Sequence, residues 1–365
     1  MKSYPQHPHG ARWLAVAAAV VSLSLVASCS SESSSDDAGG DSDSGSTDTV
    51  VLVTYDAYAL PEDAAASFTA KTGAQIQVVA SGDTGTMLTK ALLSAGAPEG
   101  DVIFGIDNTL ATRALAEDLL VPFTPDDIGS VPSQYLLDGD AGDRLVPIDT
   151  GDVCLNVDQT WFAEKGLAAP TTLEQLTEPT YQDLTVLESP VTSSPGLAFL
   201  IGTIARYGED GWKDYWQQLE DNGVSVRPSW DDAYYTDYTV SGGDRPIVLS
   251  YASSPPAEVI YSEDGLTEPK STVMLDSCAA QVEYAGVLAG AEHPELAQEL
   301  VEFMLSDEWQ QALPLSNFVF PVTDVALPDE FQQWAPRATD PLTLPPAKID
   351  ENRDTWIEQW RDQME

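Results

Sequence analysis

The feature that most constrains the fold is a regular alternation of short apolar runs with amphipathic segments, beginning at residue 50. Three runs rich in β-branched residues predict strands: V-V-L-V-T-Y (50–55), A-Q-I-Q-V-V-A (74–80) and D-V-I-F-G-I (101–106). Three segments with helical periodicity follow them in turn: 61–73, 84–96 and 109–120. Alternation of this kind is typical of an open, mostly parallel sheet that carries helices on both faces.

A second series of the same kind follows Pro147. Its predicted strands are 148–157, 184–188, 246–255 and 281–290, and its predicted helices are 161–166, 192–208 and 293–305. The chain is long enough for two lobes, with crossings near Pro147–Val157 and Cys278–Val287. We therefore expect an α/β protein in which residues 50–150 and 282–365 form lobe 1 and residues 151–281 form lobe 2, each a mostly parallel sheet flanked by helices.

Acidic residues follow all three strands of the first series. Those strands end at Tyr55-Asp56, Gly82-Asp83-Thr84 and Asp107-Asn108. Ligands of open α/β sheets bind at the carboxyl ends of strands, so these side chains suit a cationic ligand. Each aspartate is equally suited to cap the helix that follows it, and the two roles are compatible.

The N-terminal residues have the features of a secreted lipoprotein. Residues 1–28 combine a basic start, an apolar core and small residues before Cys29, in the sequence V-A-S-C. We predict a signal peptide, a lipid on Cys29 and a Ser/Gly/Asp tether over residues 29–49 that cannot bury enough apolar surface to fold. The alternative is an ordinary secretory signal with an incidental cysteine.

The composition excludes several functions. The formal net charge of −43 is unsuited to nucleic acid, and it attracts small cations, although a saline habitat explains it equally well. Neither a G-x-S-x-G elbow nor an H-E-x-x-H motif is present, and the single histidine after the signal peptide, His293, falls at a predicted helix start. Cys154 and Cys278 are predicted to form a disulfide in an extracytoplasmic protein, with two buried thiols as the alternative.

One family resemblance covers the chain from about Val51 to Trp360. Its motifs, in order, are T-Y-D-A-Y, F-G-I-D-N, P-I-D-T-G, T-S-S-P-G, W-D-D-A-Y, L-S-Y-A-S-S-P and S-N-F-V-F-P-V. The ordered set resembles the thiamine-binding substrate proteins of bacterial ABC importers. The resemblance implies a type II periplasmic-binding-protein fold with the vitamin held between two lobes.

The resemblance also implies the ligand-binding residues. They are Tyr55, Asp83, Thr84, Ser193, Trp230, Tyr251 and Phe318. Thr84 stands where the family has glycine, Phe318 where it often has tryptophan, and Ala257 where relatives can carry tyrosine. The residue types suit the ligand, because aromatic rings stack on an aminopyrimidine and attract a thiazolium cation, while a carboxylate balances its charge.

We therefore expect a monomeric, non-enzymatic binding protein, held outside the cell membrane by its lipid anchor alone. The resemblance implies that it takes thiamine, or the mono- or diphosphate, to an ABC permease and ATPase, and that it uses no cofactor or metal. One alternative is a protein of the same fold that binds ferric ion, favoured by Tyr234-Tyr235, or a polyamine. Another is a secreted hydrolase that uses a pair of carboxylates.

Overall fold

The computed structural model describes residues 48–365, so the predicted signal peptide, Cys29 and nearly all of the predicted tether lie outside the described residues. The strands are β1 Thr49–Thr54, β2 Gln75–Ala80, β3 Val102–Asp107, β4 Val146–Asp158, β5 Thr185–Glu188, β6 Ser225–Arg227, β7 Ile247–Tyr251, β8 Ser271–Val287 and β9 Phe320–Pro321. The helices are α1 Glu62–Thr72, α2 Thr84–Leu93, α3 Gln159–Lys165, α4 Ser194–Asp221, α5 Pro255–Ile260, α6 Pro294–Phe303, α7 Asp307–Ser316, α8 Asp329–Trp334 and α9 Pro346–Met364.

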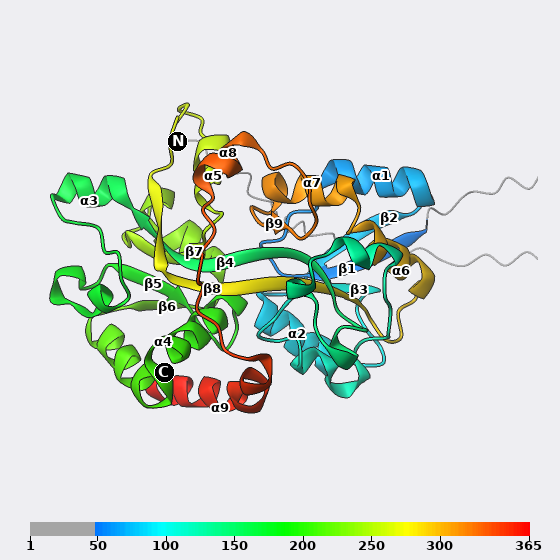
Figure 1. Ribbon diagram of the computed structural model, residues 1–365, viewed down its shortest axis with the longest axis horizontal. Coiled ribbons are helices and arrows are strands. Elements are labelled where there is room, and N and C mark those ends of the chain that lie inside the picture. The colour runs from blue at the N-terminus through cyan, green and yellow to red at the C-terminus, as the bar shows by residue number, and fades with distance from the viewer. Residues whose placement is uncertain (1–47) are drawn as a thin grey trace, which may run out of the picture. The chain divides into compact units, whose positions relative to one another are not determined.

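The strands form one mixed sheet in the order β2-β1-β3-β8-β4-β7-β5-β6, and β9 pairs with β4. The pairs at the two ends are parallel, namely β1 with β2, β1 with β3, β5 with β6, and β5 with β7. The pairs that involve the long strands β4 and β8 are antiparallel. The parallel βαβ units that the sequence predicts are thus present on either side of a central antiparallel pair (Figure 1).

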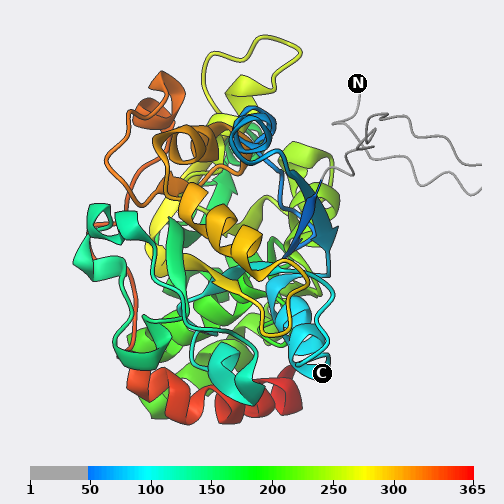
Figure 2. The same ribbon diagram turned by 90° about the vertical axis from the view of Figure 1, so that its right-hand side faces the viewer.

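Helices cover both faces of this sheet, and each face has its own apolar core. Helices α1 and α7 lie on one side, and α2, α4 and α9 lie on the other (Figures 1 and 2). Phe68 of α1, Leu300 of α6 and Trp309 of α7 belong to the first core. Met87 of α2 and Trp216 of α4 belong to the second. A helix-covered sheet of this kind is the architecture that the alternating sequence predicts.

The central strands β4 and β8 carry the disulfide. Cys154 on β4 and Cys278 on β8 are bonded, with their Cα atoms 4.2 Å apart, and both are buried. The predicted pairing is therefore confirmed. Because β8 joins β3 on one side and β4 joins β7 on the other, the disulfide ties together the two strands that connect the two ends of the sheet.

The predicted helix over residues 109–120 is wrong. Only a short 3₁₀ turn forms, at Arg113–Asp118, and it is interrupted by the left-handed backbone of Glu117 (φ 56°). The segment leaves the helical path because it returns to the sheet, where Leu120 forms a bridge with Leu288 and the N–H of Val121 donates to Val287. Pairing with the sheet here overrides the local helix propensity.

The last helix, α9, returns to α4. The rings of Trp360 and Trp216 meet edge to face with centroids 5.6 Å apart, and Trp356 Nε1 donates to Glu209 at 3.2 Å. On its other side, Arg353 of α9 donates to the backbone oxygen of Thr109 at 3.3 Å. This helix therefore packs against both the first and the second series of elements. None of the described helices is long and apolar enough to cross a membrane.

Candidate functional site

The first part of the site is built at the ends of β1 and β2. Tyr55 follows β1, and its ring fits over Gly105 of β3, where a Cβ atom would lie 2.4 Å from Cδ1 of the tyrosine. Gly105 also has φ +99°, a conformation that side chains disfavour. Glycine is therefore required at this position by both space and backbone conformation, and it fixes where the Tyr55 ring can lie.

Asp83 follows β2 and is the residue on which the site converges. Its Oδ1 accepts from the N–H of Thr84 at 2.7 Å, which caps α2, and its Oδ2 accepts from the N–H of Trp230 at 3.1 Å. Burial raises the pKa of Asp83, while the Trp230 and Thr84 hydrogen bonds oppose this rise, as do smaller effects from Ser193 and Ser194. Asp83 therefore takes the capping role that the sequence leaves open.

Close backbone contact accompanies this hydrogen bond. The N–H of Thr86 in α2 donates to the carbonyl oxygen of Thr192 at 3.2 Å. A Cβ atom at Gly85 would lie 2.8 Å from the same oxygen. Thr84 and Ser193 are both buried at this meeting point, Thr84 as the first residue of α2 and Ser193 as the N-cap of α4.

Trp230 lies in a stack of aromatic rings. Its ring stacks on Tyr234 with centroids 4.7 Å apart and an interplanar angle of 17°, and Tyr235 meets its edge at 5.3 Å. Its Nε1 donates to Ser250 Oγ at 3.0 Å, just before Tyr251 at the end of β7. Neighbours on three sides therefore hold the indole in place.

The sequence did not predict a row of acids across the three central strands. In the strand register, Asp107 of β3 lies opposite Glu283 of β8, and Glu283 lies opposite Asp149 of β4. Tyr55 Oη donates to Glu283 Oε2 at 3.4 Å. The signal was present as single charged residues inside apolar strand sequences, P-I-D-T-G and Q-V-E-Y-A-G, but a strand sequence alone does not show which strands become neighbours.

Six buried or partly buried carboxyl groups surround the site. Burial is the largest cause of a raised pKa in each of Asp83, Asp107, Asp149, Glu188, Asp231 and Glu283. The pKa of Asp107 and of Asp149 rises to about 7, and that of Asp231 to about 6. A bound cation would stabilise the ionised form of such groups, so the site favours positive charge.

The predicted site residues do not all come together. Tyr251 belongs to the group, because Glu283 and Asp83 both act on its phenol and, after burial, raise its pKa. Phe318 is placed differently. Its ring centroid lies 5.6 Å from that of Tyr261, which follows α5, and 6.3 Å from that of Phe331 in α8. None of the described contacts joins Phe318 to Asp83 or Trp230.

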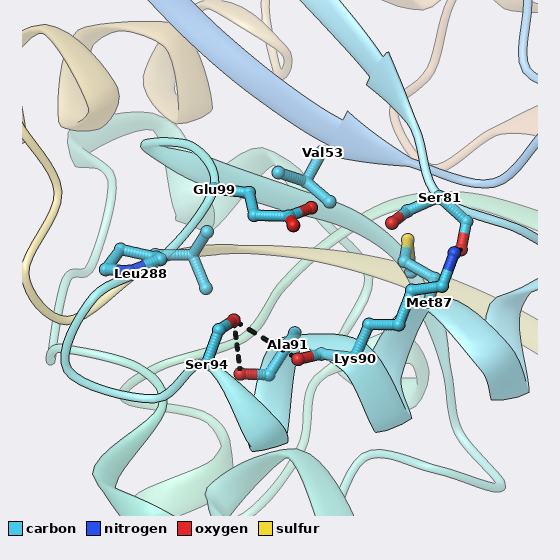
Figure 3. A pocket seen from close by; sticks show the side chains of 9 residues that line it. Val53, Ser81, Met87, Lys90, Ala91, Ser94, Glu99 and Leu288 are labelled. Carbon is cyan, nitrogen blue, oxygen red and sulfur yellow. Dashed lines mark hydrogen bonds between the residues drawn. The ribbon is translucent and has the colours of Figure 1, made fainter.

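Two pockets lie elsewhere in the described residues. One is small and partly open to solvent, lies between α2 and the sheet, and is lined by Met87, Lys90, Glu99 and Leu288 among others (Figure 3). The other is a wider, open depression beside α3 that includes Trp161. Neither contains a residue that the sequence predicts to bind ligand.

Two observations concern the alternative of a metal cargo. Across residues 48–365, no three His, Cys, Asp or Glu side chains are arranged to hold a metal ion. Of the two adjacent tyrosines that favour iron, Tyr234 is buried against Trp230, whereas Tyr235 is about half exposed. The two phenols are therefore in different environments.

Fold and site together define a binding protein of the type II periplasmic class. The model of the family described as "Bacterial extracellular solute-binding protein" matches residues 98–339. The chain therefore belongs to that family of bacterial extracellular solute-binding proteins.

Named relatives and solved structures agree with this assignment. The chain is 29% identical over 296 residues to the thiamine-binding periplasmic protein of Escherichia coli K12, covering 81% of this chain and 86% of the relative. It matches the structure of a periplasmic thiamin binding protein with a TM-score of 0.76 and 26% identity, over 87% of this chain and 96% of that one. Iron-bound HitA from Pseudomonas aeruginosa matches with a TM-score of 0.67 and 22% identity, over 87% and 99%, and shows the shared fold alone.

Proposed function

We propose that this chain is the substrate-binding subunit of an ABC importer and that its ligand is thiamine. The observation that carries the proposal is the meeting of Asp83 with Trp230, which brings a carboxylate against an aromatic stack. Tyr251 is influenced by both Asp83 and Glu283, and the Tyr55 phenol donates to Glu283. Thiamine joins a flat aminopyrimidine to a permanently cationic thiazolium, so it requires rings to stack on and negative charge nearby.

The ligand would enter by separation of the two ends of the sheet. The contacts between Asp83 and Trp230 and between Thr86 and Thr192 join elements on either side of the central strands. Opening them, with β4 and β8 as the hinge, exposes the rings, and closing them covers a bound ligand. Lobe 1 would then comprise residues 50–150 and 282–365, and lobe 2 residues 151–281, with α9 packed on lobe 2.

Isothermal titration calorimetry and native mass spectrometry test this function. Protein purified from cells should carry the mass of thiamine, and the stripped protein should bind thiamine with a one-to-one stoichiometry. Ferric ion and spermidine are tested in parallel as the alternative ligands, and glycan and ester substrates are tested for hydrolysis. A coloured ferric complex, polyamine binding or turnover, without thiamine binding, would replace the proposal.

The chain would act at the outer face of the cell membrane. Its family is extracellular, and the V-A-S-C sequence at Cys29 supports a lipid anchor followed by a flexible tether. The protein would work as a monomer that docks on a permease and its ATPase, and it would need no cofactor or catalytic group of its own. Cys29→Ala should release the protein into the medium, and unchanged retention without lipid mass on Cys29 would contradict the anchor.

A further inference from the structure

Three acids lie side by side in the middle of the sheet, in one row across β3, β8 and β4. Asp107, Glu283 and Asp149 are 0%, 3% and 1% exposed, and each end of the row is in register with Glu283. Residues directly opposite one another on antiparallel strands project to the same face, within reach of each other. The row is therefore a single electrostatic unit and not three separate buried groups.

The hydrogen bonds around this unit are incomplete unless it holds a proton. Within residues 48–365, no N–H or hydroxyl group donates to either oxygen of Asp149 or to Oδ2 of Asp107. Ionised carboxylates can only accept, so Asp149 and Glu283 satisfy each other when one of them is protonated. The pKa of Glu283 lies well above the usual value because the group is buried, because Asp149 beside it is charged, and because the two carboxyl groups share a hydrogen bond. Burial raises the pKa of Asp149 to about 7.

The unit faces the proposed ligand contacts. Tyr55 Oη donates to Glu283, and Glu283 is the largest electrostatic influence on the Tyr251 phenol after burial. Gln281, 1% exposed, donates to Ser194 at 3.4 Å, and its Oε1 has no partner among the described residues, a second buried polar group that a ligand would satisfy. The remaining titratable and charged groups facing the row are Tyr58 beside Asp149, Arg353 of α9 beside Asp107, Tyr284 of β8 beside Asp107, and Asp83 of the α2 N-terminus beside Tyr251.

Building on the proposed function, we propose that Glu283 and Asp149 are the counter-charge of the ligand's cationic ring, and that their shared proton passes to solvent when the ring binds. In the empty protein the pair carries one proton and one negative charge. In the complex both carboxylates are ionised and face one fixed positive charge, so charge and protons balance. The row thereby selects permanent cations, because a neutral ring would leave the second carboxylate protonated.

The physical reason is the linkage between charge and protonation. A positive charge near a buried carboxyl favours its ionised form, so ligand binding and proton loss strengthen each other. Release of one proton makes the association constant rise by up to about tenfold per pH unit. Because burial raises the pKa of Asp149 to about 7 and that of Glu283 well above its usual value, the pair holds at least one proton at neutral pH, and the affinity should rise with pH through that range.

Calorimetry in two buffers tests the proposal. Thiamine binding is measured at pH 6, 7 and 8 in phosphate and in Tris, whose ionisation enthalpies differ, so the difference in observed enthalpy counts the protons released. We expect about one proton per thiamine near pH 7, and none for an analogue in which an uncharged ring replaces the thiazolium. The analogue keeps the aminopyrimidine, so any proton exchange by that ring is subtracted.

Substitutions assign the proton to the row. Glu283→Gln should abolish proton release and flatten the pH dependence of affinity, while Glu258→Gln should leave both unchanged. Glu258 is a matched control, because it is also buried and has a raised pKa, but it accepts from the Lys270 N–H on another part of the fold. Should Glu283→Gln not fold, Asp149→Asn takes its place, and the comparison of thiamine with its neutral analogue stands without either variant.

Each outcome decides the question. Thiamine binding without proton release, or release that persists in Glu283→Gln or Asp149→Asn, would overturn the inference and leave the proposed function standing. Failure of the parent protein to bind thiamine at all would overturn both.

Discussion

The Asp83 carboxylate and the Trp230 backbone N–H, 147 residues apart in the sequence, lie 3.1 Å from each other. The same carboxylate caps α2, so the start of that helix and the aromatic stack are positioned by one side chain. Changes at Asp83 should therefore separate the capping role from the binding role.

Asp83→Asn keeps an acceptor for the Thr84 N–H but removes the charge. We expect thiamine affinity to fall by about tenfold or more, which corresponds to loss of a charge-assisted hydrogen bond of roughly 1.5–3 kcal/mol, with little change in stability. Asp83→Ala should also lower the free energy of unfolding by about 1 kcal/mol, because the cap is lost. Asp158→Ala is the control: Asp158 caps α3, so its loss should cost stability but not affinity. Equal affinities of parent and Asp83→Asn would contradict the role in binding.

Trp230→Ala should weaken thiamine binding by roughly tenfold, since a stacking partner of a cation contributes on the order of 1–2 kcal/mol. Titration calorimetry and quenching of tryptophan fluorescence measure the loss. Trp161→Ala is the matched control, because that partly buried indole packs near Lys165 on α3, away from the site. Should Trp230→Ala unfold instead, the indole is a core residue held by Tyr234 and Ser250, and its assignment to the pocket is wrong.

Loss of the disulfide should affect stability far more than affinity. Cys154 and Cys278 are 124 residues apart. Closing so long a loop lowers the entropy of the unfolded chain, which stabilises the folded protein by up to about 5 kcal/mol. Urea unfolding with and without reductant measures the difference, and a Cys154→Ser, Cys278→Ser double variant should no longer respond to reductant. A large loss of affinity with unchanged stability would show that the bond acts on the site.

The empty protein should be more stable at pH 5 than at pH 8. Asp107 and Asp149 have folded-state pKa values of about 7, against about 4 for unfolded aspartate, so between these values the folded chain binds more protons. The free energy of unfolding therefore falls as pH rises through this window. Urea unfolding at constant ionic strength tests it. Asp107→Asn should reduce the slope and the exposed Asp362→Asn should not, whereas higher stability at pH 8 would contradict the assignment.

Free thiamine should bind at least as tightly as thiamine diphosphate. The hydroxyl of Thr192, next to the predicted ligand-binding residue Ser193, donates to the carbonyl oxygen of Pro228 at 2.6 Å, and the carbonyl oxygen of Thr192 accepts from the N–H of Thr86. The neighbouring Glu188 carboxyl is fully buried and unfavourable to an anion. Calorimetry at low and high salt compares the two ligands, and a tenfold preference for the diphosphate at low salt would contradict the expectation.

The sequence predicted the elements better than their neighbours. Local sequence marks where β1 and α1 lie: β-branched residues mark the strand, and Gly73, in the left-handed conformation, marks the end of the helix. The helix predicted over residues 109–120 does not form, because the conformation of this segment depends on pairing at the end of β8, which is far away in the sequence. The acid row escaped detection for the same reason: Asp149 and Glu283 become neighbours only through the register of β4 with β8.

The return of α9 to α4 bears on the order in which the protein can be assembled. Trp216 and Leu219 of α4 belong to a core that also contains Trp356 and Trp360 of α9. The two pairs are more than a hundred positions apart in the sequence. A ribosome makes the second series of elements long before it makes the helix that covers them. Until the final residues emerge, Trp216 and Leu219 lack the two tryptophan rings that pack with them in the folded chain, so this apolar surface of the nascent chain stays open to chaperones and secretion factors. Truncation before Pro346 would make that state permanent.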